Sequence, residues 1–131
     1  MIDKNQSRGG SEPGTFGEIL QEMNQEGGFS RSVLATSEGL SIASAPMQPD
    51  HELASAMIAM LQKVGVETQD HLNLAPVDEV TIRTADNEHL VCRTIATDGD
   101  WICLCAVVPP GHYYRRATNR AVRRIQEMLD N

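Results

Sequence analysis

Three β-favouring runs, joined by two short turn-rich segments, are apolar at most positions and constrain the fold more than any other feature of the sequence. The runs cover residues 79–84, 89–96 and 101–108, and the connecting segments 85–88 and 97–100 are rich in turn-forming Asp, Asn and Gly. Short turns join antiparallel neighbours, so the runs predict a meander. Side chains alternate between the two faces of a strand, and both faces are therefore expected to be apolar.

The expected pairing divides the apolar side chains of the meander between two faces. One face carries Val80, Ile82, Val91, Ile95, Ile102, Leu104, Ala106 and Val108; the other carries Leu90, Cys92, Thr94, Trp101, Cys103, Cys105 and Val107. In this register Cys92 lies opposite Cys105, with Cys103 diagonal to the pair. A sheet that is apolar on both faces must be covered on both, which predicts a three-layer sandwich.

The rest of the chain supplies a hairpin and three helices. Thr15 and Glu18 form a capping-box pattern that begins a helix ending at Gly27-Gly28. Residues 29–36 and 40–44 predict a hairpin in which Gly39 takes a positive φ, and helices are expected over residues 50–64, capped by Asp50, and from about residue 113 to 129.

The predicted order is α-β-β-α-β-β-β-α, an α+β sandwich with a five-stranded antiparallel sheet. The first and third helices are expected on one face of the sheet and the middle helix on the other. Residues 1–14 are rich in Gly and Ser and lack hydrophobic periodicity, so we expect a flexible N-terminal tail followed by one domain over residues 15–131.

The middle helix has more apolar circumference than one sheet can cover. At 100° per residue its apolar side chains sweep about 200°, whereas a helix lying on a sheet needs a stripe only somewhat wider than 100°. We expect the surplus to be chiefly Ala54, Ile58 and Leu61, with Met57 beside them. A second copy of the chain can cover this surplus in a symmetric interface, so the helix predicts a homodimer. The alternative is a helix enclosed entirely by its own fold.

Charge and local motifs exclude several classes of function. The formal net charge of −7 argues against nucleic acid as a partner, and no apolar run approaches the roughly 18 residues of a membrane span. The N-terminal residues 1–6 include charges where a signal peptide is apolar, so we expect a cytoplasmic protein. Neither a phosphate-binding loop nor a nucleophile-elbow motif is present, and we expect no enzyme activity and no cofactor.

Cysteine and histidine spacing gives no sign of a metal site. Cys92, Cys103 and Cys105 are odd in number and lack CxxC spacing, and the four histidines lie about twenty positions apart. We expect the cysteines to be reduced and buried for packing, with a redox switch as the alternative.

The predicted hairpin carries a resemblance to a known family. Residues 29–44 read FSRSVLATSEGLSIAS, a small-and-aliphatic strand, a polar turn ending in Gly39, and a second strand of the form Leu-x-Ile-Ala-Ser. This pattern resembles the signature hairpin of the roadblock family of dynein-light-chain-related domains. The element order from Thr15 to the end of the chain is similar to that family's as well, and to its profilin-like sandwich.

The resemblance implies a homodimer built on the middle helices, in which the edge of the third strand pairs across the two-fold axis. That arrangement adds Val80 and Ile82 to an interface made by Ala54, Met57, Ile58 and Leu61. Bacterial members of the family often partner small Ras-like GTPases, and regulators of the MglB type promote hydrolysis by positioning the GTPase's own groups. This chain ends at Asn131, so we do not expect activities that need a longer C-terminal tail, such as nucleotide exchange.

Two polar surfaces are candidates for binding the partner. Arg116, Arg120 and Arg123, with Arg124, form a basic side of the last helix, which is either a docking stripe for an acidic partner or simply a solvated face. The second candidate is a strip on the middle helix made by Ser55, Gln62 and Lys63. Besides a GTPase regulator, we consider a structural adaptor that leaves nucleotide turnover unchanged and a small-ligand sensor, which the few aromatic residues support weakly.

Overall fold

The computed structural model describes residues 15–47 and 51–130, and the side chains of all these except 51–53. The predicted tail (1–14) and the predicted cap Asp50 lie outside the described residues. The elements occur in the expected order: α1 (Phe16–Gly27), β1 (Arg31–Thr36), β2 (Ser41–Ala45), α2 (His51–Leu72), β3 (Glu79–Arg83), β4 (His89–Thr97), β5 (Asp100–Val108) and α3 (Arg115–Leu129).

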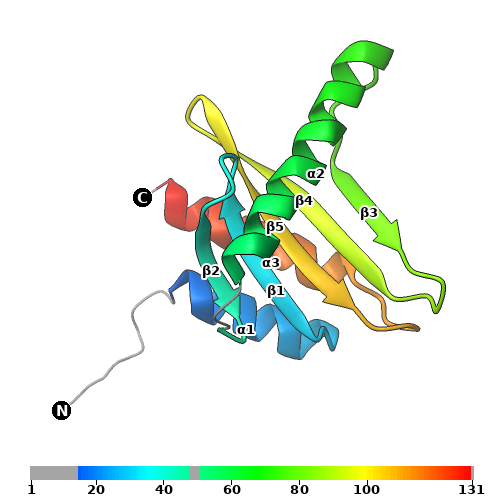
Figure 1. Ribbon diagram of the computed structural model, residues 1–131. Coiled ribbons are helices and arrows are strands. Elements are labelled where there is room, and N and C mark those ends of the chain that lie inside the picture. Colours follow the sequence, from blue (N-terminus) through cyan, green and yellow to red (C-terminus); the bar gives the residue numbers. More distant parts are fainter. Residues whose placement is uncertain (1–14, 48–50, 131) are drawn as a thin grey trace.

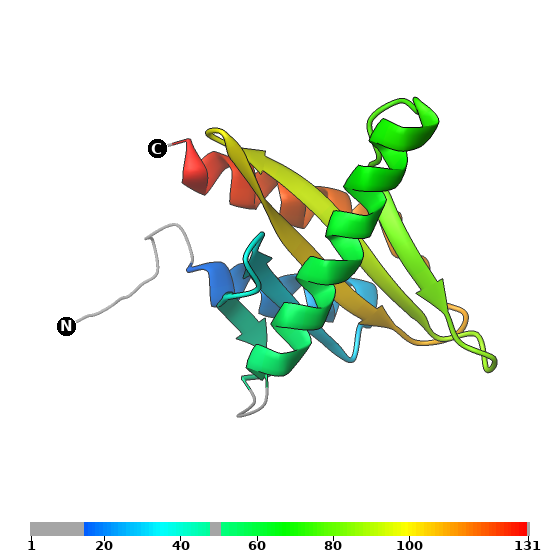
Figure 2. The same ribbon diagram turned by 45° about the horizontal axis from the view of Figure 1, so that its top comes forward.

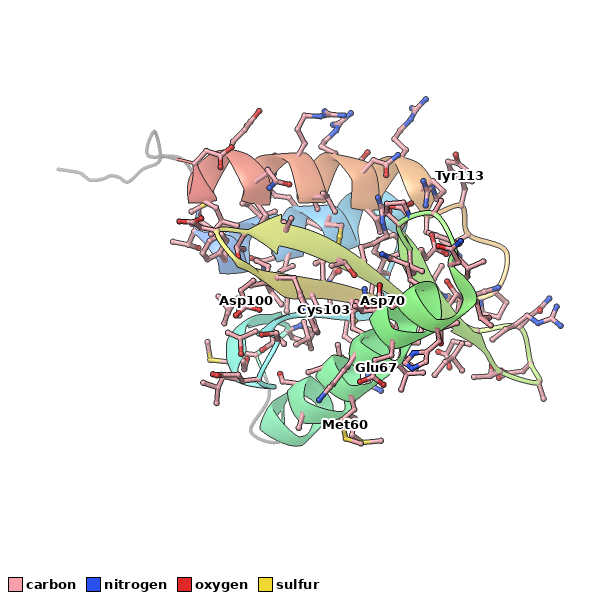
Figure 3. The ribbon with its side chains drawn as sticks, turned by 90° about the horizontal axis from the view of Figure 1, so that it is seen from above. Met60, Glu67, Asp70, Asp100, Cys103 and Tyr113 are labelled. Carbon is pink, nitrogen blue, oxygen red and sulfur yellow. The ribbon has the colours of Figure 1, made fainter. Side chains whose placement is uncertain are left out.

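The strands form one antiparallel sheet in the order β2-β1-β5-β4-β3, so β2 and β3 are its edges. Helices α1 and α3 cover one face, and α2 crosses the other face diagonally and continues past the end of the sheet (Figures 1 and 2). Viewed from above, the three layers lie one on another with the sheet in the middle (Figure 3). The three-layer sandwich predicted from the meander is confirmed.

The α1–α3 side holds the larger core. The capping box fixes the start of α1: Glu18 N donates to Thr15 Oγ1 at 3.2 Å and Thr15 N to Glu18 Oε1 at 3.1 Å, as predicted. The helix ends at Gly28, whose φ is 72°. Its buried face packs with α3 and the strands, and the side chains buried there include Ile19, Leu20, Leu34, Val91, Ile95, Leu104, Val108 and Ile125. Burial of this apolar layer is what holds two helices against the sheet.

The register of the meander was predicted correctly for one pair of strands and wrongly for the other. Cys92 lies opposite Cys105 between β4 and β5, as expected. Between β3 and β4, Arg83 pairs with His89, so five residues (84–88) form the connection where four were predicted. A slip of one residue turns every side chain of a strand to the other face. Val80 and Ile82 therefore lie on the α2 face, opposite Cys92 and Leu90.

Helix α2 is longer than predicted. Its apolar periodicity ends near Val64, but the helix continues to Leu72 through charged and polar residues. No proline or positive-φ residue interrupts it before Asn73, whose φ is 57°, and Leu74 N then donates to Gln69 O at 2.9 Å. The C-terminal end of α2 extends beyond the sheet (Figure 1). Hydrophobic periodicity marks where a helix has a core to face, and a helix can continue where that core ends.

Gly39 ties the β1–β2 turn to α2. Its φ is 91°, and a Cβ at this position would lie 3.0 Å from Cα of Ala56. We expect Gly39→Ala to lower the free energy of unfolding by about 2 kcal/mol, because it combines a left-handed backbone with a contact against the helix. Gly99→Ala is the matched control, since Gly99 has φ 78° and open space around it. Urea unfolding that shows equal losses for the two variants would contradict the contact with α2.

Candidate interaction site

An apolar stripe runs along the outward side of α2. Met57, Met60 and Val64 are 62%, 68% and 59% exposed. Their spacing of three and four residues places them on one side of the helix. Met60 points away from the sheet (Figure 3). Large apolar side chains gathered in one exposed stripe indicate a surface that another protein covers.

The side of α2 that faces the sheet is partly polar, contrary to prediction. Ser55 and Gln62 were predicted to be exposed for partner binding, but they are 0% and 1% exposed. Gln62 Nε2 donates to Thr94 Oγ1 on β4. Both residues are therefore excluded from a contact surface, and of the predicted strip Lys63 alone is exposed. Sequence hydrophobicity could not reveal this orientation, because it assigns polar side chains to water.

The orientation of α2 also changes which apolar residues form the predicted surplus on the helix. Ile58 is 7% exposed and Leu61 half-buried, and both pack against the sheet with Cys92, Cys103 and Cys105. Their assignment to the exposed surplus was wrong. Of the expected residues, Ala54 and Met57 are exposed, and the exposed stripe extends through Met60 and Val64 instead. The surplus of apolar circumference is present, but it is displaced about one residue step around the helix.

A groove of about 460 Å³ continues the stripe toward the sheet. Its apolar lining comes from α2, β1, β4 and β5, and includes Val33, Ala54, Met57, Ile58, Leu90 and Val107. Ile82 on the edge strand β3 is 45% exposed on this same face of the sheet. The corrected register of β3 thus places Ile82 on the same side of the sheet as the helix stripe.

The predicted basic side of α3 lies on the opposite layer of the molecule. Arg116, Arg120 and Arg123 are exposed, as expected. Arg120 approaches Glu26 of α1 at 3.8 Å, and Arg124 forms an ion pair with Glu22 of the same helix. These exposed pairs contribute little stability. Within the part of the chain that the structure describes, Arg116 and Arg123 form no ion pair, and so they are the cations of α3 most available to a partner.

A buried arginine that was not identified from the sequence links β4 to α3 and to the residue that precedes β3. Arg93 of β4 is 6% exposed on the α1–α3 face of the sheet. Its Nη1 donates to Thr118 Oγ1 at 3.0 Å and to Asn119 Oδ1 at 2.9 Å, and its Nη2 lies 3.3 Å from Asp78 Oδ1. Arg93 occupies the same face of the strand as Val91 and Ile95, so its charge is buried and needs hydrogen-bonding or charged partners. This position between two buried apolar residues could have identified Arg93 as a buried arginine from the sequence.

Two carboxylates at the start of β3 form ion pairs and a hydrogen bond with residues at the start of α3. Arg115 Nη1 lies 3.0 Å from Asp78 Oδ2 and 2.8 Å from Glu79 Oε1, and the Tyr114 hydroxyl donates to Glu79 Oε2 at 2.6 Å. Partial burial raises the pKa of both carboxyl groups. The hydrogen bond and charge of Arg115 act in the other direction, together with Arg93 at Asp78 and with Thr81 and Tyr114 at Glu79. The net result is a lowered pKa for each.

We expect the stability of the fold to fall in acid because of these two carboxylates. A carboxyl group whose pKa is lower in the folded than in the unfolded chain stabilises the fold above the unfolded value and loses that contribution as pH falls through the folded value. The ordinary values are 3.8 for Asp78 and 4.5 for Glu79, so the free energy of unfolding should decline below about pH 4.5. Urea unfolding between pH 7 and 3 measures the slope. Asp78→Asn should make it shallower, and an unchanged slope would refute the assignment.

Comparison with known proteins assigns the family. The Roadblock/LC7 domain family matches residues 15–107, and the chain therefore belongs to that family. The search of curated proteins returned no match. Among the described helices, none combines the length and apolarity that crossing a membrane requires.

Solved structures of bacterial proteins share the fold. A Roadblock/LC7 domain from Streptomyces avermitilis superposes with a TM-score of 0.78 at 15% identity, covering 88% of this chain and 98% of that one. Myxococcus xanthus MglB gives 0.77 at 10% identity, with 88% and 94% covered. The gliding protein MglB from Thermus thermophilus gives 0.74 at 17% identity, with 98% of both chains covered. At these identities the similarity establishes the roadblock fold.

Proposed function

We propose that this protein is a cytoplasmic homodimeric regulator that binds a small Ras-like GTPase and increases its rate of GTP hydrolysis. Membership of the Roadblock/LC7 family and structural similarity to MglB support a regulator that is not itself an enzyme. A structure described as MglB with a tetrameric arrangement, which matches at a TM-score of 0.72 and 17% identity over 98% of both chains, is consistent with self-association.

The exposed apolar stripe of α2 is the observation that carries the homodimer. Met57, Met60 and Val64 leave an exposed apolar stripe on α2, and Met57 also lines the groove. A symmetric pairing of two α2 helices would cover the stripe on both copies at once, and pairing of β3 with its copy would satisfy the free edge. The remaining residues predicted for this interface would border it: Ala54, Ile58, Leu61, Val80 and Ile82. Of these, Ile58, Leu61 and Val80 pack between α2 and the sheet and would support the interface without being exposed in it.

Two exposed basic surfaces remain as contacts for the GTPase. Lys63 lies on α2, adjacent to the proposed dimer axis, while Arg116, Arg120 and Arg123 lie on α3. The α2 and α3 surfaces are on opposite layers of the molecule (Figure 3), so each can be altered without changing the other. Single variants at Lys63 and at Arg123 therefore separate them.

The function is tested by single-turnover hydrolysis with each small GTPase encoded in the same genome. We expect the cognate GTPase to release phosphate at least about tenfold faster in the presence of the dimer, which corresponds to a barrier lower by about 1.4 kcal/mol. Lys63→Glu should abolish the acceleration if α2 binds the GTPase, and Arg123→Glu should do so if α3 does. Binding without acceleration would favour a structural adaptor, and no binding to any of these GTPases would exclude the proposal.

A further inference from the structure

All three cysteines of the chain converge beneath α2. Cys92 on β4 lies opposite Cys105 on β5, and Cys103 occupies the same face two residues earlier on β5. Each is at most 1% exposed, and the three Sγ atoms all lie within 4.8 Å of one another. The Sγ atoms of Cys103 and Cys105 are 3.5 Å apart. Residues from two neighbouring strands thus form one compact group of sulfur atoms.

The spacing of these sulfur atoms fits a single metal ion. A metal–sulfur distance of about 2.3 Å places two sulfur ligands of one ion roughly 3.8 to 4.0 Å apart in tetrahedral or trigonal geometry. The observed separations, 3.5 Å for one pair and no more than 4.8 Å for any, bracket that range.

The ligand atoms and their surroundings select a thiophilic ion. The group consists of sulfur alone, without a histidine or carboxylate, and soft thiolates favour Cu(I) and Zn(II) over Mg(II) or Ca(II). Its wall is apolar and is built by Val33, Ile58, Leu61, Val80, Leu90 and Trp101. The groove beside α2 reaches Cys105 and gives an ion a path to this cluster.

Gln62 of α2 provides a second, independent observation. It is 1% exposed, and its Nε2 donates to Thr94 Oγ1, which lies on the residue opposite Cys103. Its Oε1 is buried and has no hydrogen-bond partner among the described residues. A buried carbonyl oxygen without a donor is costly, and a cation beside it would satisfy it. Gln62 Oε1 is therefore a candidate oxygen ligand from the helix side of the sheet.

We propose that Cys92, Cys103 and Cys105 bind one thiophilic d10 metal ion, Zn(II) or Cu(I), between the sheet and α2, with Gln62 Oε1 as the fourth ligand. Full coordination releases three thiol protons and leaves a charge of −1 with Zn(II) and −2 with Cu(I). The ion would connect β4, β5 and α2, the helix that carries the apolar stripe.

Metal titration of the reduced full-length protein tests the site. Zn(II) is titrated against a chromophoric indicator, and Cu(I) without oxygen against a competing Cu(I) chelator. We expect one ion per chain, loss of thiol reactivity in the native protein and a higher melting temperature. Co(II) in place of Zn(II) should show a sulfur-to-metal charge-transfer band, which reports thiolate ligation independently of stability. Saturation by either ion at these thiols supports the proposal, and binding of neither overturns it.

Variants separate the site from adventitious binding. Cys92→Ala, Cys103→Ala and Cys105→Ala should each weaken binding at least 100-fold while the circular dichroism spectrum stays native, and Gln62→Leu should weaken it less. Met47→Leu is the control, because Met47 also carries sulfur but is 85% exposed and outside the cluster. Equal binding by the triple alanine variant would overturn the proposal, as would binding only after denaturation.

Discussion

Met60→Asp should convert the protein from a dimer into a monomer, with the mass in light scattering falling from twice the chain mass to 14.4 kDa. Met60 is 68% exposed at the centre of the α2 stripe, between Met57 and Val64. In the proposed interface the carboxylates of two symmetric copies would lie close together in apolar surroundings. Losing two buried methionines and burying two like charges should weaken dimerisation by about 100-fold or more, or about 2.7 kcal/mol.

Tyr113→Asp is the matched control for that experiment. Tyr113 is 74% exposed, comparable with Met60, but it lies at the start of the α3 layer on the other side of the sheet (Figure 3). Introducing the same charge there should leave the dimer intact. A wild-type protein that is monomeric at micromolar concentration, or a Met60→Asp variant that remains dimeric, would refute the α2 interface and with it the dimeric regulator.

The elements that were predicted well are those with a local physical signature. The capping box at Thr15 and Glu18, the glycine stop at Gly28 and the β1–β2 and β4–β5 turns are encoded within a few residues of one another, and each appears where expected. The three layers followed from a simple requirement, since a sheet apolar on both faces has to be covered on both.

The elements that were predicted poorly depend on contacts between distant segments. Which side chains of β3 face α2 depends on whether four or five residues connect β3 to β4. The connection has five residues, and Thr84 N donates to Glu88 O across it at 2.8 Å. The orientation of α2 places Gln62 toward the sheet, where its side chain donates a hydrogen bond to Thr94 of β4. Neither contact produces a periodic pattern in the sequence. A prediction from hydrophobicity alone therefore placed Gln62 in water and Ile82 on the wrong face of the sheet.

Candidate sites follow the same division. The exposure of Arg116 and Arg123 on α3 was predicted correctly because an amphipathic helix reveals its polar side, and their role in binding a partner stays a prediction. The cysteine cluster was not recognised as a possible metal site, because its members come from two strands and the usual ligand spacings are absent. The pairing of Cys92 with Cys105 and the diagonal position of Cys103 were predicted, whereas the burial of Gln62 over the same face of the sheet required the tertiary structure.

Arg93→Ala should lower the free energy of unfolding by about 3 kcal/mol, the second large effect that the structure predicts. The change removes three hydrogen bonds, to Thr118, Asn119 and Asp78, and leaves a cavity under α3. Most of the loss should come from the bond to Thr118, which is 1% exposed, because Asn119 is exposed and the side chain of Asp78 is 57% exposed, so that water screens the ion pair.

Arg93→Met separates the packing of this side chain from its hydrogen bonds. Methionine fills most of the arginine stem's volume and carries no charge, so it should restore about half of the loss seen with Arg93→Ala. The buried Nε of Arg93 has no partner among the described residues, and its removal offsets part of the cost of the lost hydrogen bonds. Urea unfolding of the three proteins at pH 7 measures both terms. Losses below about 1 kcal/mol for Arg93→Ala would show that the network does not hold α3 against the sheet.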